Sequence, residues 1–482
     1  MSNRVKAIPA ARLGAVSPIP GADWLTTRVI LVTLASMAVR LIKQVLDFPL
    51  WRALVRLDPL TRGWVTLVMG NAARLALGLG SSVLIARALA PSQYGVYLIL
   101  GAFVYIVGAI ADLGVSDAAV RDISSAWPQQ PARAAQHAQA YLAIKIGAAT
   151  LVVLVGVAFA DPLARLLGVP DDTWLVLALL GIIATALSSS LGSILQAAGQ
   201  FARLTLVTFS NTALTTLLAV ALYATGQLTL VTALAVLGIA TSLASFAIAQ
   251  RLLPEAFGRL TLFALPKREV LRSDGGRLIR FGRWLWVSNI LIMITGYFDV
   301  LLVGRWSAPA VVGFYGLGLN LVTKVDVVNT SLYTVLLPAA AALSDSHSLR
   351  LYVRRALVRS AVISLLLLPL VFLVPPFIVI FYGSAFEPAG MYFQAMFGLV
   401  IIDIFAWPLI LLAFPFNQPK LLAAADALRA ATMLSTAVLL IPIYGPMGAV
   451  AGKFAAKIAG TIFTLVALRR LQRTKTLGLG RE

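Results

Sequence analysis

The chain has 482 residues, of which 60% are hydrophobic and only 12% are charged. A soluble domain carries about 25% charged residues, so this composition excludes an ordinary soluble protein and indicates a polytopic membrane protein. The absence of cysteine excludes disulfides and thiol chemistry. Two histidines and few acids offer no metal-ligand spacing, and we expect neither a metal nor a cofactor.

The first 63 residues differ from the rest of the chain. The stretch RVILVTLASMAVRLIKQVLDFPLW (28–51) has apolar runs broken by Arg40, Lys43 and Asp47. Its apolar core is about half of the roughly 20 residues that a membrane crossing needs. We therefore predict an N-terminal interfacial amphipathic helix in this segment rather than a further crossing.

Twelve apolar runs of membrane-spanning length follow this segment, six in each half of the chain. The predicted fold is an all-α membrane protein, with twelve transmembrane helices in two parallel six-helix lobes around a central cavity. The predicted spans are 64–88, 97–120, 140–160, 173–196, 206–223, 228–250, 284–304, 314–337, 356–382, 389–414, 421–442 and 447–468.

The basic residues indicate how these spans are oriented. On the map of twelve crossings, 30 of the 39 Lys and Arg residues fall on the side of the two termini and 3 fall on the opposite side. This asymmetry places both termini in the cytoplasm. The same asymmetry explains the net charge of +20, because most of the basic residues mark the cytoplasmic side of the membrane and add some attraction to anionic lipid. Nucleic acid is therefore not an expected partner.

The predicted domains follow from the same map. They are a cytoplasmic or interfacial N-terminal segment, an N-lobe, a basic cytoplasmic linker, a C-lobe and a basic cytoplasmic tail. Their respective ranges are 1–63, 64–253, 254–283, 284–468 and 469–482.

A repeated turn supports the division into two halves. The stretches LIARALAPSQYGVY (84–97) and LVGRWSAPAVVGFY (302–315) share six of fourteen residues at a constant offset of 218. Each copy ends the first span of a half and opens the second. Because each half holds an even number of spans, the repeat is parallel. We expect the lobes to superpose by a near two-fold rotation about the membrane normal and to work by alternating access.

These segments also resemble a known family. LIARALAPSQYGVYLILGAFVYIVGAIADLGVSDAAVRDIS resembles the second-helix region of bacterial polysaccharide-repeat flippases of the Wzx type, as do YFDVLLVGRWSAPAVVGFYGLGLNLV and YGPMGAVAGKFAAKIAGTIFTL. The resemblance covers residues 64–468, and the superfamily includes multidrug/toxin extrusion carriers and the lipid II flippase. It implies a flippase of the bacterial inner membrane that moves an undecaprenyl-pyrophosphate-linked oligosaccharide repeat unit to the outer leaflet, for surface polysaccharide biosynthesis.

The resemblance implies a cavity between the first two helices of each lobe, and each of these helices carries an ionisable residue. They are Arg74, Asp112, Asp299 and Lys324, and Lys324 is followed by Asp326. Ionisable residues inside a membrane are costly, so each is a functional candidate. Arg74 and Lys324 would bind the anionic pyrophosphate, and the aspartates would moderate anion binding or take up a coupling proton. The alternative is that Arg74–Asp299 or Lys324–Asp112 pairs only hold the lobes together.

Lys453 and Lys457 are two further candidates for substrate binding. They lie four residues apart on one predicted helix and have no acidic neighbour in the sequence. Two cations on one face favour either the wall of a wet cavity or an anion site.

Four other intramembrane charges are weaker candidates. Asp426 and Arg429 are three residues apart and are expected to neutralise each other. Asp403 has no obvious partner in the sequence, and Lys145 is expected to extend its ammonium toward the interface.

Three other functions remain open as alternatives. A membrane enzyme would need a substantial outer loop with catalytic groups, and the longest outer connection, Asp161–Asp172, is too short for one. A multidrug or cation antiporter and a lipid II flippase belong to the same superfamily, but the cationic cavity favours an anionic load. The expected partners are the lipid-linked oligosaccharide, membrane lipids, a coupling proton or sodium ion, and polysaccharide-assembly proteins. A monomer is expected.

Overall fold

The computed structural model describes residues 59–257, 266, 268–326, 328–329, 346–411 and 419–478. By its contacts the chain divides into two units, residues 1–62 and residues 63–482, and the second is described here by itself. The predicted interfacial helix of residues 28–51 lies outside the described residues.

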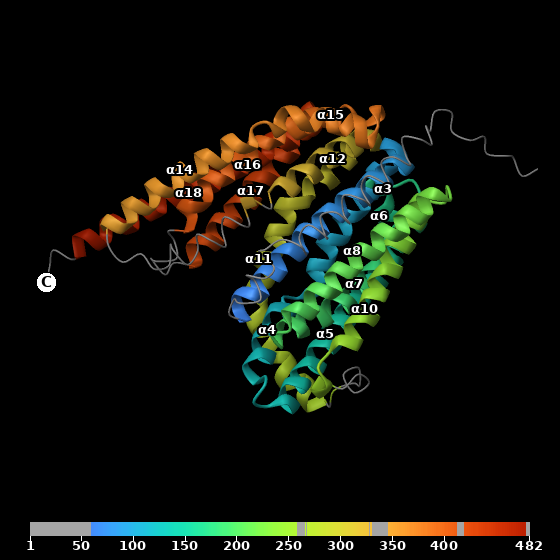
Figure 1. The fold of residues 1–482 in the computed structure, drawn as a ribbon, viewed down its shortest axis with the longest axis vertical. Helices are drawn as coiled ribbons and strands as arrows, with labels where there is room; N and C mark the ends of the chain where they lie inside the picture. The colour runs from blue at the N-terminus through green and yellow to red at the C-terminus, as the bar shows by residue number, and fades with distance from the viewer. Residues whose placement is uncertain are drawn as a thin grey trace, which may run out of the picture. The chain divides into compact units, whose positions relative to one another are not determined.

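The described part of the chain is helical throughout (Figure 1). The first half contains α3 (Pro59–Asp112), α4 (Val115–Ala126), α5 (Pro131–Ala158), α6 (Ala160–Leu167), α7 (Asp172–Ala197), α8 (Phe201–Ala224), α9 (Leu230–Thr232), the π-helix η1 (Ala233–Ala240) and α10 (Thr241–Leu252). The second half contains α11 (Arg268–Trp306), α12 (Pro309–Val325), α14 (Ser346–Leu367), α15 (Leu370–Tyr382), α16 (Ala389–Ile410), α17 (Pro419–Tyr444) and α18 (Pro446–Gly478). An all-helical membrane protein is therefore confirmed.

Ten segments of the described residues are long and apolar enough to cross a membrane. One of them, Ala73–Asp112, has 40 residues, which at 1.5 Å per residue is about 60 Å, or twice the hydrocarbon core. It is interrupted at Ala90, whose φ of 54° and ψ of 169° are not helical, directly before Pro91. A shorter apolar helix, Pro309–Val325, begins within the second copy of the repeated turn.

Several helix ends differ from the predicted spans. The span predicted over 97–120 ends at Asp112, because Leu113 and Gly114 both have positive φ and a new helix starts at Val115. The basic linker predicted over 254–283 includes residues 268–283, which form the first turns of α11. Hydropathy detects only the apolar part of a helix, so polar turns that continue beyond the membrane were missed.

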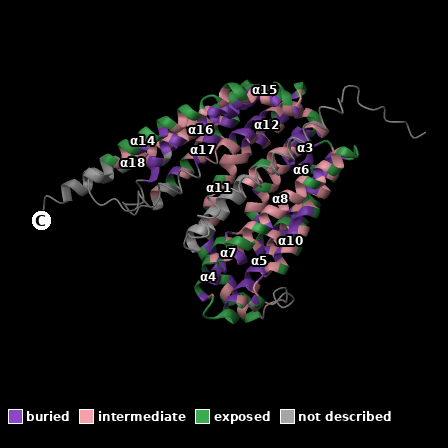
Figure 2. Cartoon of the chain, viewed as in Figure 1, coloured by how far each residue is buried: buried purple, intermediate pink, exposed green. Residues whose placement is uncertain are grey.

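Burial separates the helices that face lipid from those that are enclosed. Leu365, Leu366 and Phe372 on α14 and α15 are large apolar side chains that stay exposed, as Figure 2 shows along both helices. α16 packs against α12, α14, α15 and α18 and is the more enclosed helix. The exposed apolar side chains of α14 and α15 are therefore suited to contact with lipid tails.

The two copies of the repeated turn meet each other. A Cβ atom built on Gly95 would lie 1.8 Å from the carbonyl oxygen of Pro309, and one built on Gly313 would lie 2.3 Å from the carbonyl oxygen of Pro91. Pro309 and Gly313 are Pro91 and Gly95 shifted by 218. Gly95 of the first copy therefore meets Pro309 of the second, while Gly313 of the second meets Pro91 of the first. A reciprocal contact of this kind is what a two-fold axis between two copies produces.

Other contacts surround this glycine contact. The guanidinium group of Arg87 donates to the carbonyl oxygens of Phe381 and Ile380, at 2.6 and 2.7 Å. Tyr94 stacks edge-on against Phe386. These contacts join α3 to residues more than 290 positions later in the chain.

α11 also contacts helices from both halves of the chain. It lies against α4 and α5 of the first half and against α17 of the second (Figure 1). Gly114 and Gly282 allow its close approach to the first half, since a Cβ on either would lie within 2.6 Å of the other's carbonyl oxygen. Trp286 adds a hydrogen bond from its ring nitrogen to the carbonyl oxygen of Ile110, at 3.0 Å.

Candidate substrate-binding site

The acid at the end of α3 has a cation beside it. The Nζ of Lys145 lies 3.0 Å from Oδ1 of Asp112, and Ser116 donates its hydroxyl to the same carboxylate. Lys145 is only 7% exposed and also donates to Ser116 Oγ and Tyr141 Oη. It therefore does not extend toward the interface as the sequence suggested, because Asp112 and two hydroxyl groups satisfy its ammonium inside the protein.

Asp299 of α11 is the most completely enclosed acid of the candidate set, with no exposed surface. The Nζ of Lys453 on α18 lies 3.1 Å from Oδ2, and the hydroxyl of Tyr315 on α12 donates to the same oxygen. Lys453 also donates to the carbonyl oxygens of Thr295 and Gly296. A buried carboxylate needs this pairing, since an isolated charge is costly to desolvate.

Two more intramembrane pairs follow the same pattern. Lys457 of α18 forms an ion pair with Asp403 of α16. Arg429 lies 2.7 Å from Asp426 within α17, as predicted.

These contacts correct two expectations. Lys453 and Lys457 have acidic neighbours, and Asp403 has a partner, but each partner lies on another helix. Helical spacing shows only neighbours three or four residues apart, so the sequence could not show these pairs. The cations on Asp112 and Asp299 are Lys145 and Lys453, and neither belongs to the inter-lobe pairs considered from the sequence.

Arg74, Lys324 and Asp326 remain after these pairs are set aside. Arg74 lies half-buried in α3, and Lys324 lies half-buried in the last turn of α12. Among the described residues, no hydrogen bond or ion pair is found for Lys324. Asp326 follows directly after α12 and accepts a hydrogen bond from the Nδ2 of Asn329, at 2.6 Å. That Arg74 and Lys324 share one cavity stays a prediction.

The pairing decides the charge that the interior offers to a ligand. Four acids are neutralised by four cations: Asp112 by Lys145, Asp299 by Lys453, Asp403 by Lys457, and Asp426 by Arg429. The other intramembrane candidates are Arg74, Lys324 and Asp326, and Lys324 has no partner among the described residues. With six cations against five acids, the candidate set is positive overall, which suits an anionic rather than a cationic load.

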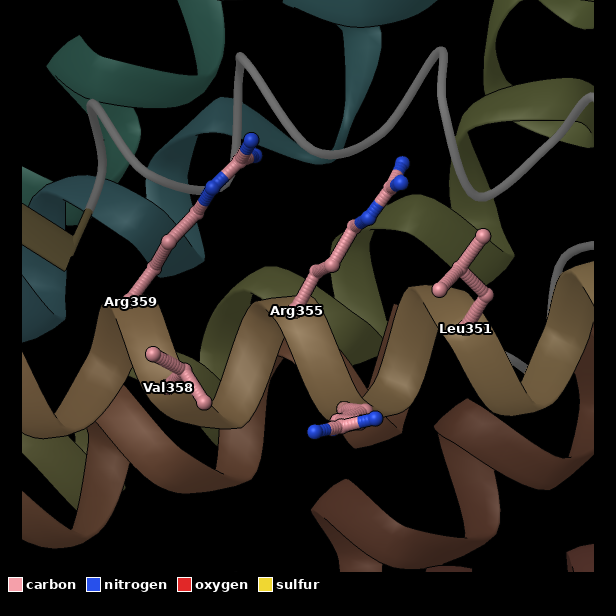
Figure 3. A pocket seen from close by; sticks show the side chains of 5 residues that line it. Leu351, Arg355, Val358 and Arg359 are labelled. Carbon is pink, nitrogen blue, oxygen red and sulfur yellow. The ribbon is translucent and has the colours of Figure 1, made fainter.

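A row of arginines on α14 was counted in the sequence only as a topology signal. Leu351, Arg354, Arg355, Val358 and Arg359 line a recess of about 330 Å³. Figure 3 shows Arg355 and Arg359 projecting from the same side of the helix, as expected for residues four positions apart. Within the described part of the chain, these arginines have no acidic partner, so their charges are available to an anion.

The fold is that of a known class of transporters. The chain is similar to an inward-facing multidrug resistance MATE family transporter of the MOP superfamily, with a TM-score of 0.63 and 15% identity over 83% of this chain and 95% of that one. It is also similar to the lipid II flippase MurJ in an inward closed conformation, with a TM-score of 0.58 and 13% identity over 84% and 87% of the two chains. A MOP superfamily transporter from Pyrococcus furiosus Vc1 gives a TM-score of 0.52 and 18% identity over 87% and 98%.

The amino-acid sequence identifies the family to which the chain belongs. The profile described as "Polysaccharide biosynthesis protein" matches residues 84–391, which is more than half of the chain. The chain therefore belongs to the polysaccharide biosynthesis protein family and has the fold of the MOP-superfamily transporters. The chain thus shares its fold with transporters, in keeping with the superfamily that the sequence resembles. No sequence among curated proteins matches the chain.

Proposed function

We propose that this protein is a flippase that moves an undecaprenyl-pyrophosphate-linked oligosaccharide repeat unit from the inner to the outer leaflet of the bacterial inner membrane. The family ties the chain to polysaccharide biosynthesis. The observation that carries the substrate is the half-buried ammonium of Lys324, which has no hydrogen bond or ion pair among the described residues, within a set of intramembrane candidates that stays positive once the four ion pairs are formed.

The chemistry of the load explains why such cations are needed. A pyrophosphate cannot cross hydrocarbon without partners that replace its water. The planar guanidinium of Arg74 offers two parallel donors to phosphate oxygens, and Lys324 offers a mobile point charge. Arg355 and Arg359 on α14 would give the anion a first contact before it reaches the interior. Asp112 and Asp299 hold their lysines in place in this scheme, and Asp326 limits how tightly the anion is held.

The proposal includes the arrangement of the helices. Ala73–Asp112 counts as two crossings because it breaks at Ala90, and Pro309–Val325 counts as another, which gives twelve. Two six-helix lobes would rock about the contact between the repeated turns, with both termini in the cytoplasm and a proton or sodium gradient as the energy source.

The test measures the export of surface polysaccharide by each variant of the protein, expressed in a strain that lacks the native gene. Arg74→Ala and Lys324→Ala should each reduce surface polysaccharide at least tenfold while the protein still inserts, since a charge-assisted hydrogen bond contributes roughly 1.5–3 kcal/mol. Lipid-linked oligosaccharide should accumulate in the inner leaflet. Arg74→Lys should rescue only in part because the fork geometry is lost.

A matched control is Arg165→Ala, which removes an exposed arginine paired with Asp161 and should leave export unchanged. Full export by Arg74→Ala and Lys324→Ala would contradict the proposed site. Loss of drug resistance instead of polysaccharide in the deletion strain would favour a multidrug antiporter. Loss of peptidoglycan synthesis would favour a lipid II flippase.

A further inference from the structure

A second basic recess lies away from the proposed transport path, on the side of the membrane predicted to be cytoplasmic. It has a volume of about 430 Å³ and is enclosed by α4, α5 and α11. Its lining includes three arginines, Arg121, Arg133 and Arg277, each from a different helix. Arg277 lies more than 140 positions from the other two in the sequence, so the fold brings these cations together.

Asp122 fixes two of the three guanidinium groups. This carboxylate is nearly buried, and it accepts from the Nη2 of Arg121 at 2.7 Å and from the Nε of Arg277 at 2.9 Å. The guanidinium of Arg121 also lies 3.4 Å above the ring of Phe281. Both arginines nevertheless keep more than 40% of their side chains exposed. They are therefore held in position while part of each side chain remains accessible to solvent.

The remaining polar groups add to this arrangement. Arg133 donates to the Oε1 of Gln130 at 3.3 Å, and both residues line the recess. His137 is buried, with its Nδ1 3.0 Å from the Oδ2 of Asp274. The Nη2 of Arg277 also lies 3.5 Å from the Oδ1 of Asp274. When Asp122 and Asp274 are both counted against the three arginines, one positive charge is left over.

Topology alone does not explain the recess. The positive-inside rule requires basic residues on this side, but it sets neither their orientation nor a shared anchor. The arginine row on α14 shows the difference, because Arg354, Arg355 and Arg359 lie on one helix without an acidic anchor among the described residues. In the α4–α5–α11 recess, a nearly buried carboxylate holds two guanidinium groups that line one space, and paired guanidinium donors suit the oxygens of a phosphate.

We propose that the α4–α5–α11 recess binds a phosphate-bearing anion, held by Arg121 and Arg277 together and closed over by Arg133. The anion would be either the headgroup of an anionic lipid or a soluble phosphate ester, since both present the same oxygens. Because Arg277 belongs to α11 and the other two belong to α4 and α5, the bound anion would tie α11 to the first half of the chain. None of these residues belongs to the Arg74–Lys324 site, so this inference does not depend on the proposed function.

The test uses the full chain in nanodiscs of zwitterionic lipid. One arm titrates inorganic phosphate, and the other replaces a fraction of the lipid with phosphatidylglycerol; thermal unfolding reports binding in both. The variant Arg121→Gln, Arg133→Gln should weaken the midpoint of the response about tenfold or more, since two charge-assisted donors are lost. The matched control is Arg272→Gln, Arg280→Gln, which removes the same charge from α11 outside the recess and should keep the wild-type response.

The outcomes separate the two sources of phosphate. A response to inorganic phosphate assigns a soluble ester, and a response to phosphatidylglycerol alone assigns a lipid headgroup. No response in either arm, or an equal loss in the recess and control variants, would overturn the proposal. Arg121→Lys keeps the charge and the topology signal, so it remains informative where the glutamine variant does not fold. It should still weaken binding several-fold because the fork is lost, and unchanged binding would count against the assigned geometry.

Discussion

Replacing Gly95 with alanine tests whether the contact between the repeated turns closes one side of the transporter. The added methyl group would lie 1.8 Å from the carbonyl oxygen of Pro309 and 3.0 Å from the backbone nitrogen of Gly313. Both are backbone atoms, which cannot rotate away as a side chain can. The two turns must therefore move apart, and the structure fixes how far.

The displacement follows from the distances. An ordinary Cβ contact begins near 3.4 Å, so the backbones must separate by about 1.6 Å from the distance of 1.8 Å at Gly95. Overpacking of this kind costs roughly 1–3 kcal/mol, which lowers the population of the closed arrangement about 5- to 150-fold. At an unconstrained helical glycine, a change to alanine should stabilise the helix by roughly 0.5–1 kcal/mol. At Gly95 we expect the change to destabilise the closed arrangement instead.

A cysteine reporter makes the opening measurable, because the chain has no native cysteine. Val312 lies beside Gly313 and has no exposed surface. In a Val312→Cys background, Gly95→Ala should raise the rate of maleimide labelling of the purified protein about fivefold or more. Gly101→Ala is the matched control, since a Cβ at Gly101 meets nothing within 4 Å. Equal labelling rates in the two variants would refute the reasoning.

Two further predictions concern the charge pairs and the orientation. Asp299→Asn should lower the stability of the purified protein by about 3–5 kcal/mol, since it leaves the ammonium of Lys453 buried without a counter-charge. Adding Lys453→Met should restore most of the loss in a thermal unfolding experiment, and a fully stable single variant would show that the pair carries little energy. In intact cells an impermeant reagent should label Asp171→Cys and spare Gly276→Cys, and the opposite pattern would reverse the topology.

The sequence was sufficient for the fold class because the membrane imposes a strong pattern. Runs of roughly 20 apolar residues are needed to cross the bilayer, and no other requirement produces so many of them. The helix ends were harder to predict. α11 begins at Arg268 among charged residues, and the segment after Tyr97 ends at Asp112 because of two positive φ angles. Backbone geometry of this kind leaves no trace in hydropathy.

The partners of the intramembrane charges could not be read from the sequence for a different reason. Asp112 and Lys145 are 33 positions apart, and Asp299 and Lys453 are 154 apart, so only the packing of helices brings them together. The one pair that was predicted, Asp426 with Arg429, lies within a single helix. Sequence spacing therefore identified the candidate residues but not which of them neutralise one another.

The repeat gives these observations a common explanation. The turn contact is reciprocal, so each copy supplies both a proline carbonyl and a glycine, and a change in one copy disturbs the fit of the other. Both copies must therefore keep the same residues. The intramembrane charges are under no such constraint. At the offset of 218, Ser81 stands where Asp299 would repeat, and Ile292 and Ile106 stand opposite Arg74 and Lys324. In the proposed mechanism, two lobes that move by symmetry can thus carry a load that is recognised by asymmetric cations, because the turn contact and the proposed binding charges use different residues.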